Sequence, residues 1–299
     1  MRSRVLLFGV TLLFATTAKA INVGIDPTAT WLGFMNVSEL PAHGGAYVFG
    51  SGWGVPDLTA TFSGAVLTLG PNSVNDPNPF WYTPSGGPGA TGNKICDANI
   101  YQEKTDTFAG QQVIFTGTVL ANTLANGYTS MAFIKDFAPD YSSSRTASVS
   151  LTPGVFSVSL ATGPQLGRHV QFGFETIGPD VWITDRAPIG TVKVTTGPGD
   201  FNQNGVVDAG DIAAMETALT DEPTFAAGHG LTTAQLALIG DLDGDGKFTN
   251  ADLPVLLTQL SVGGGSLASV PEPSSIILLA VGGFGLATLQ RRPMRTPMS

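Results

Sequence analysis

Two acidic stretches near the C-terminal end constrain the fold of this chain most strongly. They span residues 200–211 and 241–252, and each carries Asp, Asn or Thr at alternating positions around a glycine at its sixth position. This spacing is typical of the twelve-residue calcium loop, in which Ca²⁺ takes about six to eight oxygen ligands and the glycine permits a sharp turn. Two carboxylates about 4 Å apart repel by about 4 kcal/mol at an effective dielectric constant of about 20. We therefore expect a bound dication to hold these loops in shape.

Each loop offers six candidate calcium ligands. In the first loop they are the side chains of Asp200, Asn202, Asn204, Asp208 (directly or through a water) and Asp211, with the carbonyl of Val206. In the second loop they are the side chains of Asp241, Asp243, Asp245, Thr249 and Asp252, with the carbonyl of Lys247. Mg²⁺ fits less well, because it requires strict octahedral geometry and keeps several of its waters. The sequence therefore predicts two Ca²⁺ sites.

An apolar pattern with helical spacing follows each loop. The apolar positions are Ile212, Met215 and Leu219 after the first loop, and Leu253, Leu256, Leu257 and Leu260 after the second. Such spacing places the apolar side chains on one face of a helix. The connector between the repeats also contains a helical segment at 232–239. One such loop could be an ordinary Asp/Asn/Gly turn, but two copies that each lead into a helix argue against chance.

A pair of loop–helix repeats without the preceding helix of an ordinary EF-hand resembles the dockerin type I module, here over residues 197–261. The resemblance implies a small α-helical, EF-hand-like domain that binds calcium and docks onto a cohesin-like protein. Such modules often tether proteins that act on polysaccharides. The positions that read the partner in this family are often Ser or Thr, whereas this chain has Ala209-Gly210 and Asn250-Ala251. The connector between the two repeats is also unusually long.

Residues 21–196 show a β pattern throughout. In 156–160 and 170–174 apolar and polar or small residues alternate, which places the apolar side chains on one face of a strand. Similar short runs, separated by Gly, Pro, Asn and Asp, occupy 58–69, 112–120, 128–137, 147–152, 181–184 and 190–195. We expect a mainly β fold, an antiparallel β-sandwich that is jelly-roll-like. Residues 71–99 have almost no periodicity and predict a long loop.

The N-terminal 20 residues are typical of a secretory signal peptide. Residues 1–4 are basic, residues 5–15 are apolar, and Ala18 and Ala20 supply the small side chains that signal peptidase reads. The mature protein is expected to begin at Ile21.

The other end carries a second targeting pattern. A Gly/Ser linker at 262–269 leads to a three-part segment at 270–292, which is followed by a tail at 293–299. The three parts are Pro271-Glu272-Pro273, an apolar run at 276–289 and Arg291-Arg292. The apolar run predicts a short transmembrane helix, with the arginines on the cytoplasmic side.

This arrangement resembles the PEP-CTERM sorting signal. The resemblance implies export across the inner membrane, initial anchoring there by the C-terminal helix, recognition by an exosortase and cleavage near Pro271-Glu272-Pro273. It also implies a final place in the cell envelope, on the outer surface or in an extracellular biofilm matrix.

The composition of the chain argues against some properties of the β domain. The formal net charge of −9 and the absence of a Lys/Arg cluster argue against nucleic acid as a partner. Cys96 is the only cysteine, so no intrachain disulfide can form. We expect a non-catalytic structural or adhesive domain at the cell surface.

Two alternatives remain open for this domain. It could bind carbohydrate, with Phe80, Trp81 and Tyr82 as candidate stacking faces in the long loop, unless these rings pack beneath that loop. It could also be a glycoside hydrolase or another polysaccharide-acting enzyme, which would need two carboxylates about 5 to 9.5 Å apart. No motif selects such a pair among Glu39, Asp57, Asp97, Glu103, Asp106, Asp136, Asp140 and Glu175.

Overall fold

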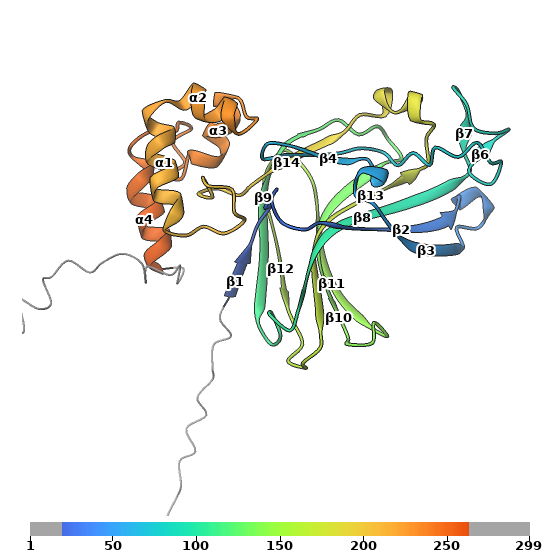
Figure 1. Cartoon of the computed structure of the whole chain (residues 1–299), viewed down its shortest axis with the longest axis horizontal. Helices are drawn as coiled ribbons and strands as arrows, with labels where there is room; N and C mark the ends of the chain where they lie inside the picture. Colours follow the sequence, from blue (N-terminus) through green and yellow to red (C-terminus); the bar gives the residue numbers. More distant parts are fainter. Residues whose placement is uncertain (1–19, 263–299) are drawn as a thin grey trace, which may run out of the picture.

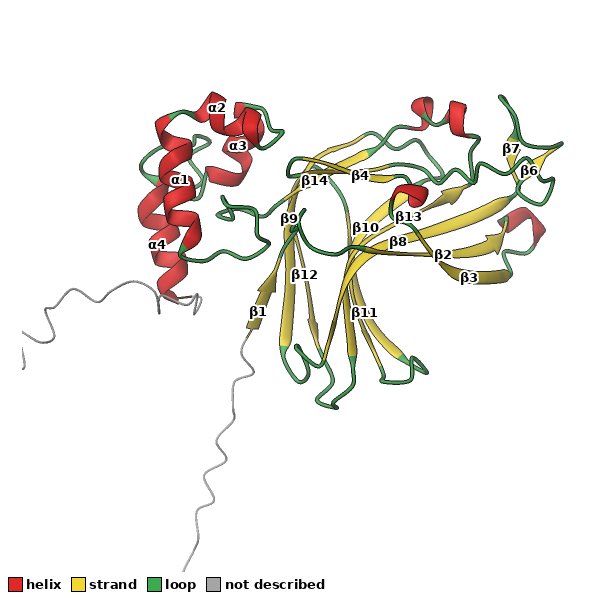
Figure 2. Ribbon diagram, viewed as in Figure 1, coloured by secondary structure: helices red, strands yellow, loops and turns green. Residues whose placement is uncertain are grey.

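The structure is a computed structural model that describes residues 20–262, and it contains a β-sandwich followed by a helical unit (Figure 1). The last strand of the sandwich ends at Thr195, and the first α-helix begins at Gly210. Residues 1–19 of the expected signal peptide lie outside the described residues, as do the sorting segment and the tail. The mainly β class and the antiparallel sheets are confirmed, and all four α-helices of the described part lie in the helical unit (Figure 2).

The first sheet of the sandwich has six strands and is organised around β9. Strand β12 pairs with one edge of β9, while β1 and β14 share the other edge and β14 leads on to β5 and β4. Strand β1 runs parallel to β9, and the other pairs of this sheet are antiparallel. The bounds are β1 (Ala20–Val23), β4 (Ala60–Ser63), β5 (Val66–Leu69), β9 (Gln112–Asn122), β12 (Gly154–Ala161) and β14 (Val192–Thr195).

The second sheet also has six strands, all antiparallel, in the order β11-β10-β13-β8-β2-β3. Its long strands bend, so that the face turned away from the first sheet is concave (Figure 1). The bounds are β2 (Leu32–Glu39), β3 (Tyr47–Trp53), β8 (Lys94–Thr105), β10 (Thr129–Phe137), β11 (Ser144–Ser150) and β13 (His169–Pro179). A two-stranded sheet of β6 (Tyr82–Thr83) and β7 (Thr91–Gly92) lies beyond it.

The alternation seen in the sequence matches the buried faces. In β12, Phe156 and Val158 are buried while the serines beside them are exposed. Phe115 of β9 packs against Phe156 and Phe174, with ring centroids 5.3 and 5.4 Å apart, and so joins the two sheets. Burial of such aromatic side chains dominates the energetics of a core.

Three strand expectations need correction. Residues 181–184 form no strand, because Ile183–Asp185 is a 3₁₀ turn. Residues 71–99 are not loop throughout, since β8 begins at Lys94. Strands β1, β2 and β3 were not predicted, and β3 carries glycines at positions 50 and 52 that interrupt its apolar pattern. Antiparallel pairing with β2 makes this segment a strand, although the sequence of β3 alone does not indicate one.

The helical unit contains α1 (Gly210–Thr220), α2 (Glu222–Gly228), α3 (Thr233–Gly240) and α4 (Asp252–Val262). Its core holds Phe201, Met215, Leu236 and Leu256, each at most 1% exposed. The helices expected after each loop and in the connector are confirmed, and α2 is additional. Helix α3 begins with a reciprocal capping box between Thr232 and Gln235, which satisfies two N–H groups at its start.

The helical unit packs directly on the first sheet. Val66 of β5 and Leu120 of β9 contribute to the helical core, and the Ala65 N–H donates to the His229 carbonyl at 3.1 Å. A methyl group on Gly24 would lie 2.8 Å from the Gly205 carbonyl oxygen, so only glycine allows this approach. We call this region, formed by residues 24–26, 63–66, 205 and 229–230, the interdomain contact.

One charged pair is buried in the sandwich. Arg168 Nε donates to Asp136 Oδ1 at 2.7 Å, and the two side chains are 8% and 0% exposed. Asp136 Oδ2 also accepts from the Gly163 N–H at 2.8 Å. Breaking a buried pair leaves one charge uncompensated, which costs far more than losing an exposed pair.

Asp136→Ala should therefore lower the free energy of unfolding by about 3–5 kcal/mol, measured by urea denaturation. Glu216→Ala, which removes an exposed carboxylate from α1, is the control and should leave the urea midpoint unchanged. Equal midpoints for wild type and Asp136→Ala would contradict the assigned role of the pair.

Candidate metal centres

The first loop, residues 200–211, holds two buried carboxylates inside a ring of backbone donors. Asp200 accepts from the N–H groups of Asn204 and Gly205 at 3.1 and 3.0 Å. Asp211 accepts from the N–H groups of Asn202 and Asp208 at 2.9 and 2.7 Å. The first and last predicted ligands are thus oriented by backbone N–H groups of the residues between them.

The second loop, residues 241–252, repeats this arrangement. Asp252 accepts from the N–H groups of Asp243 and Thr249 at 3.1 and 2.8 Å, which are the same loop positions that bond Asp211. Asp241 accepts from the N–H groups of Gly244 and Gly246 at 2.8 and 2.9 Å. The repetition means that the two acidic stretches fold in closely similar ways.

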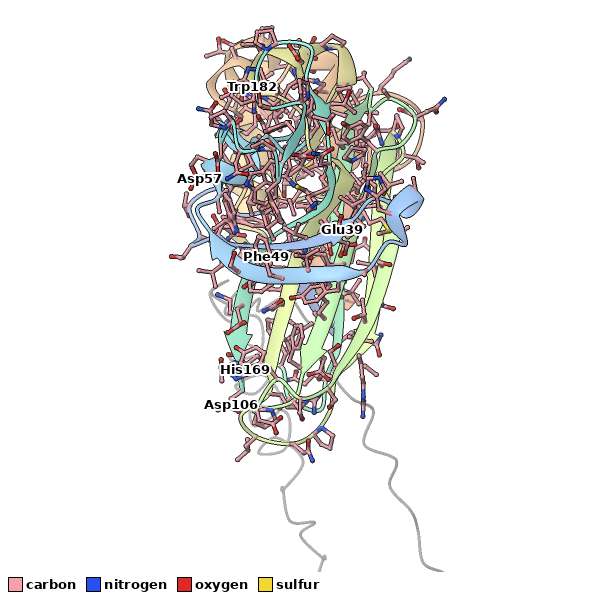
Figure 3. All side chains as sticks on the ribbon, turned by 90° about the vertical axis from the view of Figure 1, so that its right-hand side faces the viewer. Glu39, Phe49, Asp57, Asp106, His169 and Trp182 are labelled. Atoms are coloured by element: carbon pink, nitrogen blue, oxygen red, sulfur yellow. The ribbon has the colours of Figure 1, made fainter. Side chains whose placement is uncertain are left out.

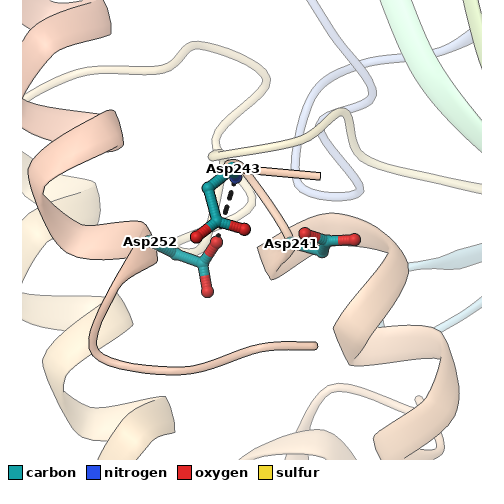
Figure 4. Close-up of side chains that lie close together, drawn as sticks. All are labelled: Asp241, Asp243 and Asp252. Carbon is teal, nitrogen blue, oxygen red and sulfur yellow. Dashed lines mark hydrogen bonds between the residues drawn. The ribbon is translucent and has the colours of Figure 1, made fainter. Parts of the chain in front are cut away.

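Three carboxylates of the second loop converge on one point (Figure 4). Ligand oxygens of Asp241, Asp243 and Asp252 lie within 4.8 Å of one another. Oxygens that share one Ca²⁺ at about 2.3–2.6 Å lie at most about 5 Å apart. The spacing therefore fits a single calcium ion.

The remaining predicted ligands line the same loops. The side-chain oxygens of Asn202 and Asn204 accept from backbone N–H groups two residues further on, at 3.0 and 2.8 Å. In the second loop Asp243, Asp245 and Thr249 do the same, at 3.0, 2.8 and 3.2 Å. Gly205 and Gly246 adopt φ values of +81° and +84°, the left-handed turn that the sixth position requires.

The electrostatics of the first loop favour a cation. The pKa of Asp200 is raised to about 7: burial is the main cause, hydrogen bonds from Thr196 and the backbone oppose it, and the charge of Asp211 adds to it. Burial is also the main cause that raises the pKa of Asp211. A bound dication would favour the ionised forms, so calcium and protons compete for these groups and calcium should bind more weakly as the pH falls below about 7.

The candidate carbohydrate surface at residues 80–82 is not an exposed platform. Trp81 is 8% exposed and Tyr82 is fully buried, where its hydroxyl donates to the Val74 carbonyl at 2.5 Å. Phe80 is 37% exposed, but the ammonium group of Lys94 lies 4.3 Å from its ring centroid. Trp81 and Tyr82 belong to the main hydrophobic core of the sandwich, where burying their aromatic surface is favourable, and Phe80 packs edge-to-face against Trp81.

Most carboxylates that were candidates for catalysis have local partners. Asp136 pairs with Arg168, Glu39 pairs with Lys94 at 3.1 Å, and Asp106 accepts from the Gly167 N–H. Asp97 and Glu103 of β8 and Glu175 of β13 lie on the outer face of the second sheet, where they contact Asn99, Gln171 and Lys135 respectively. Burial, followed by the charge of Glu175, raises the pKa of Asp97.

The predicted membrane and sorting residues lie outside the described residues. They are Pro271, Glu272, Pro273, Arg291 and Arg292, together with the apolar run at 276–289. Within residues 20–262, no helix has the length and apolar character needed to cross a membrane.

Wild-type protein should bind two Ca²⁺ ions in isothermal titration calorimetry at pH 7.5, and Asp211→Ala and Asp252→Ala should each bind one, since each loses a carboxylate that also organises its loop. Asp221→Asn changes an acid outside both loops that caps α2, and it should still bind two. Unchanged stoichiometry in both alanine variants would contradict the assigned sites.

Comparison with known families agrees with this geometry. The Dockerin type I domain matches residues 198–261, and the PEP-CTERM protein-sorting motif matches residues 269–292. Dockerin type I domains bind calcium. No curated protein and no solved structure matches the chain. The chain therefore carries a dockerin type I domain followed by a PEP-CTERM sorting motif, which indicates an exported, envelope-associated protein.

Proposed function

We propose that this chain is a non-catalytic surface protein whose dockerin domain binds two Ca²⁺ ions and docks onto a cohesin-like partner. The observation that carries the proposal is the pair of matching loops, each with carboxylates at its first and last positions that accept backbone N–H groups of the loop. The dockerin domain implies a cohesin partner, and the sorting motif implies processing by an exosortase.

Calcium would act by compensating buried negative charge. Asp200, Asp211 and Asp252 are 2%, 0% and 0% exposed, and each one begins or ends a predicted metal loop. An uncompensated buried carboxylate is unfavourable, because its charge has lost its hydration. The metal would supply that compensation, so the folded dockerin domain and its docking surface would depend on calcium.

The sandwich would serve as the surface-exposed cargo of this arrangement. Its candidate catalytic carboxylates are largely engaged in ion pairs and backbone contacts, which supports a structural or adhesive role. Signal peptidase would remove residues 1–20, and exosortase recognition would place the mature chain at the outer surface or in a biofilm matrix. Turnover of a polysaccharide by the purified protein would overturn the non-catalytic part of this proposal.

Surface plasmon resonance against a panel of type I cohesin domains tests the docking. We expect binding in millimolar Ca²⁺ that is lost in excess chelator and in Asp211→Ala/Asp252→Ala, while Asp221→Asn binds like wild type. Binding that persists in chelator would contradict the role given to calcium. Failure of calcium-loaded wild type to bind any cohesin would contradict docking of this type.

The interdomain contact would link the metal to the sandwich. Gly205 at the sixth position of the first loop lies against Gly24, and its own added methyl group would lie 3.3 Å from the Asp26 Cβ. Ordering of the first loop by calcium would therefore also stabilise its contact with the start of the sandwich. The dockerin domain would be held against its cargo rather than tethered to it by a free linker.

Gly24→Ala should loosen this contact, because the new methyl group would lie 2.8 Å from a backbone oxygen. Limited proteolysis should then cut between the sandwich and α1 faster than in wild type, even with calcium present. Gly228→Ala is the control, since no atom beyond its chain neighbours and the backbone of its own helix lies within 4 Å of its added methyl group. Equal cleavage rates for wild type and Gly24→Ala would argue that the two domains do not depend on this contact.

A further inference from the structure

The concave outer face of the second sheet contains a groove that the docking function does not use. Its volume is about 440 Å³, within the range of about 300–1,000 Å³ typical of small-molecule sites. Strands β2, β8, β10 and β13 and the loop after β10 supply its lining. Figure 3 views the molecule from this side, with β2 and β3 crossing above His169. We call it the outer groove.

Polar side chains in the outer groove are fixed by one another. Lys135 Nζ donates to Asn99 Oδ1 at 2.6 Å and to Glu175 Oε2 at 3.0 Å. The Asn99 and Asn36 amides donate to the two oxygens of Asp97, at 2.7 and 3.1 Å. Because these groups already hold each other in place, a ligand that meets them loses little affinity to side-chain ordering.

A second polar group lies beside the first. Gln171 is 8% exposed, and its amide donates to Glu103 Oε2 at 2.8 Å. The hydroxyl of Tyr141 donates to Glu103 Oε1 at 3.2 Å. Amides and carboxylates on rigid strands provide both donors and acceptors at fixed positions.

An aromatic surface borders these groups. Tyr141 is 50% exposed and adopts a φ of +57°, a backbone region that bulky residues rarely occupy. Its ring stacks on His169, with centroids 4.4 Å apart, and the Phe137 ring lies 5.5 Å away. The loop is thus held in an unfavourable conformation that presents a ring at the groove, which points to a functional role. Phe34 and Tyr101 also line the groove.

We infer that the outer groove binds a neutral saccharide. A sugar ring has an apolar C–H face that can cover an aromatic ring, and hydroxyls that each donate and accept hydrogen bonds, as amide and carboxylate groups require. Glu103 and Lys135 are the charged side chains that line the groove, and Asp97 and Glu175 adjoin it through their hydrogen bonds with Asn99 and Lys135. Acids thus outnumber the one base, so an acidic sugar would be repelled. An extended peptide is disfavoured, because the groove lies on the face of the sheet and offers no strand edge for pairing.

The test is calorimetric titration of the full chain with neutral, uronate and amino-sugar oligosaccharides. We expect binding to at least one neutral oligosaccharide, weakened at least tenfold in Tyr141→Ala and less in Tyr141→Phe, which keeps the ring. Phe80→Ala removes an aromatic ring outside the groove, and Leu166→Ala removes a side chain that is 79% exposed. Both controls should bind like wild type.

Three results would overturn the inference. They are no binding of any neutral oligosaccharide at millimolar concentration, preferential binding of uronates or amino sugars, and equal affinity in Tyr141→Ala and wild type. The dockerin domain packs on the first sheet, so the same affinity should be measured in chelator and in Asp211→Ala/Asp252→Ala. Saccharide binding and calcium-dependent docking can therefore fail independently.

Discussion

Burial of carboxylates inside two short loops is the constraint on which the dockerin domain depends. Asp211 and Asp252 are fully buried, each at the start of the helix that follows its loop, and each accepts backbone N–H groups from residues across the loop. Those bonds orient the carboxylates but do not neutralise them. A divalent ion would supply the missing charge, so the shape of the loops, the direction of α1 and α4 and the domain core between them would follow from one electrostatic requirement.

Charge compensation in the first loop would also affect the sandwich, because Gly205 of that loop is part of the interdomain contact. Gly24 and Gly64 allow the backbones of the two domains to approach closely, and Val66 places a sandwich side chain in the dockerin core. The dockerin domain therefore stands on the first sheet, while the outer groove opens on the second sheet. This separation would let one molecule hold a protein partner and a saccharide at the same time, a combination suited to a polysaccharide-rich cell surface.

Local spacing made the dockerin domain predictable, because each ligand, turn glycine and helix start lies within twelve consecutive residues. Alternation likewise predicted the buried face of β12. The burial of Trp81 and Tyr82 was not predictable from local spacing. Tyr82 is buried by segments distant in the sequence, and its hydroxyl lies 3.3 Å from the Val181 carbonyl. The outer groove is harder still, because Asn36, Asn99 and Gln171 come from three strands that become neighbours only in the folded sheet.

Hydrogen exchange of the full chain with and without calcium tests the central claim most directly. If calcium compensates the buried carboxylates, adding it will slow exchange of the N–H groups that bond them, such as those of Asn204, Gly205 and Gly246. The Ala65 N–H at the interdomain contact should slow with them. Identical exchange in calcium and in chelator would show that the loops hold their shape without the ion and would contradict the account.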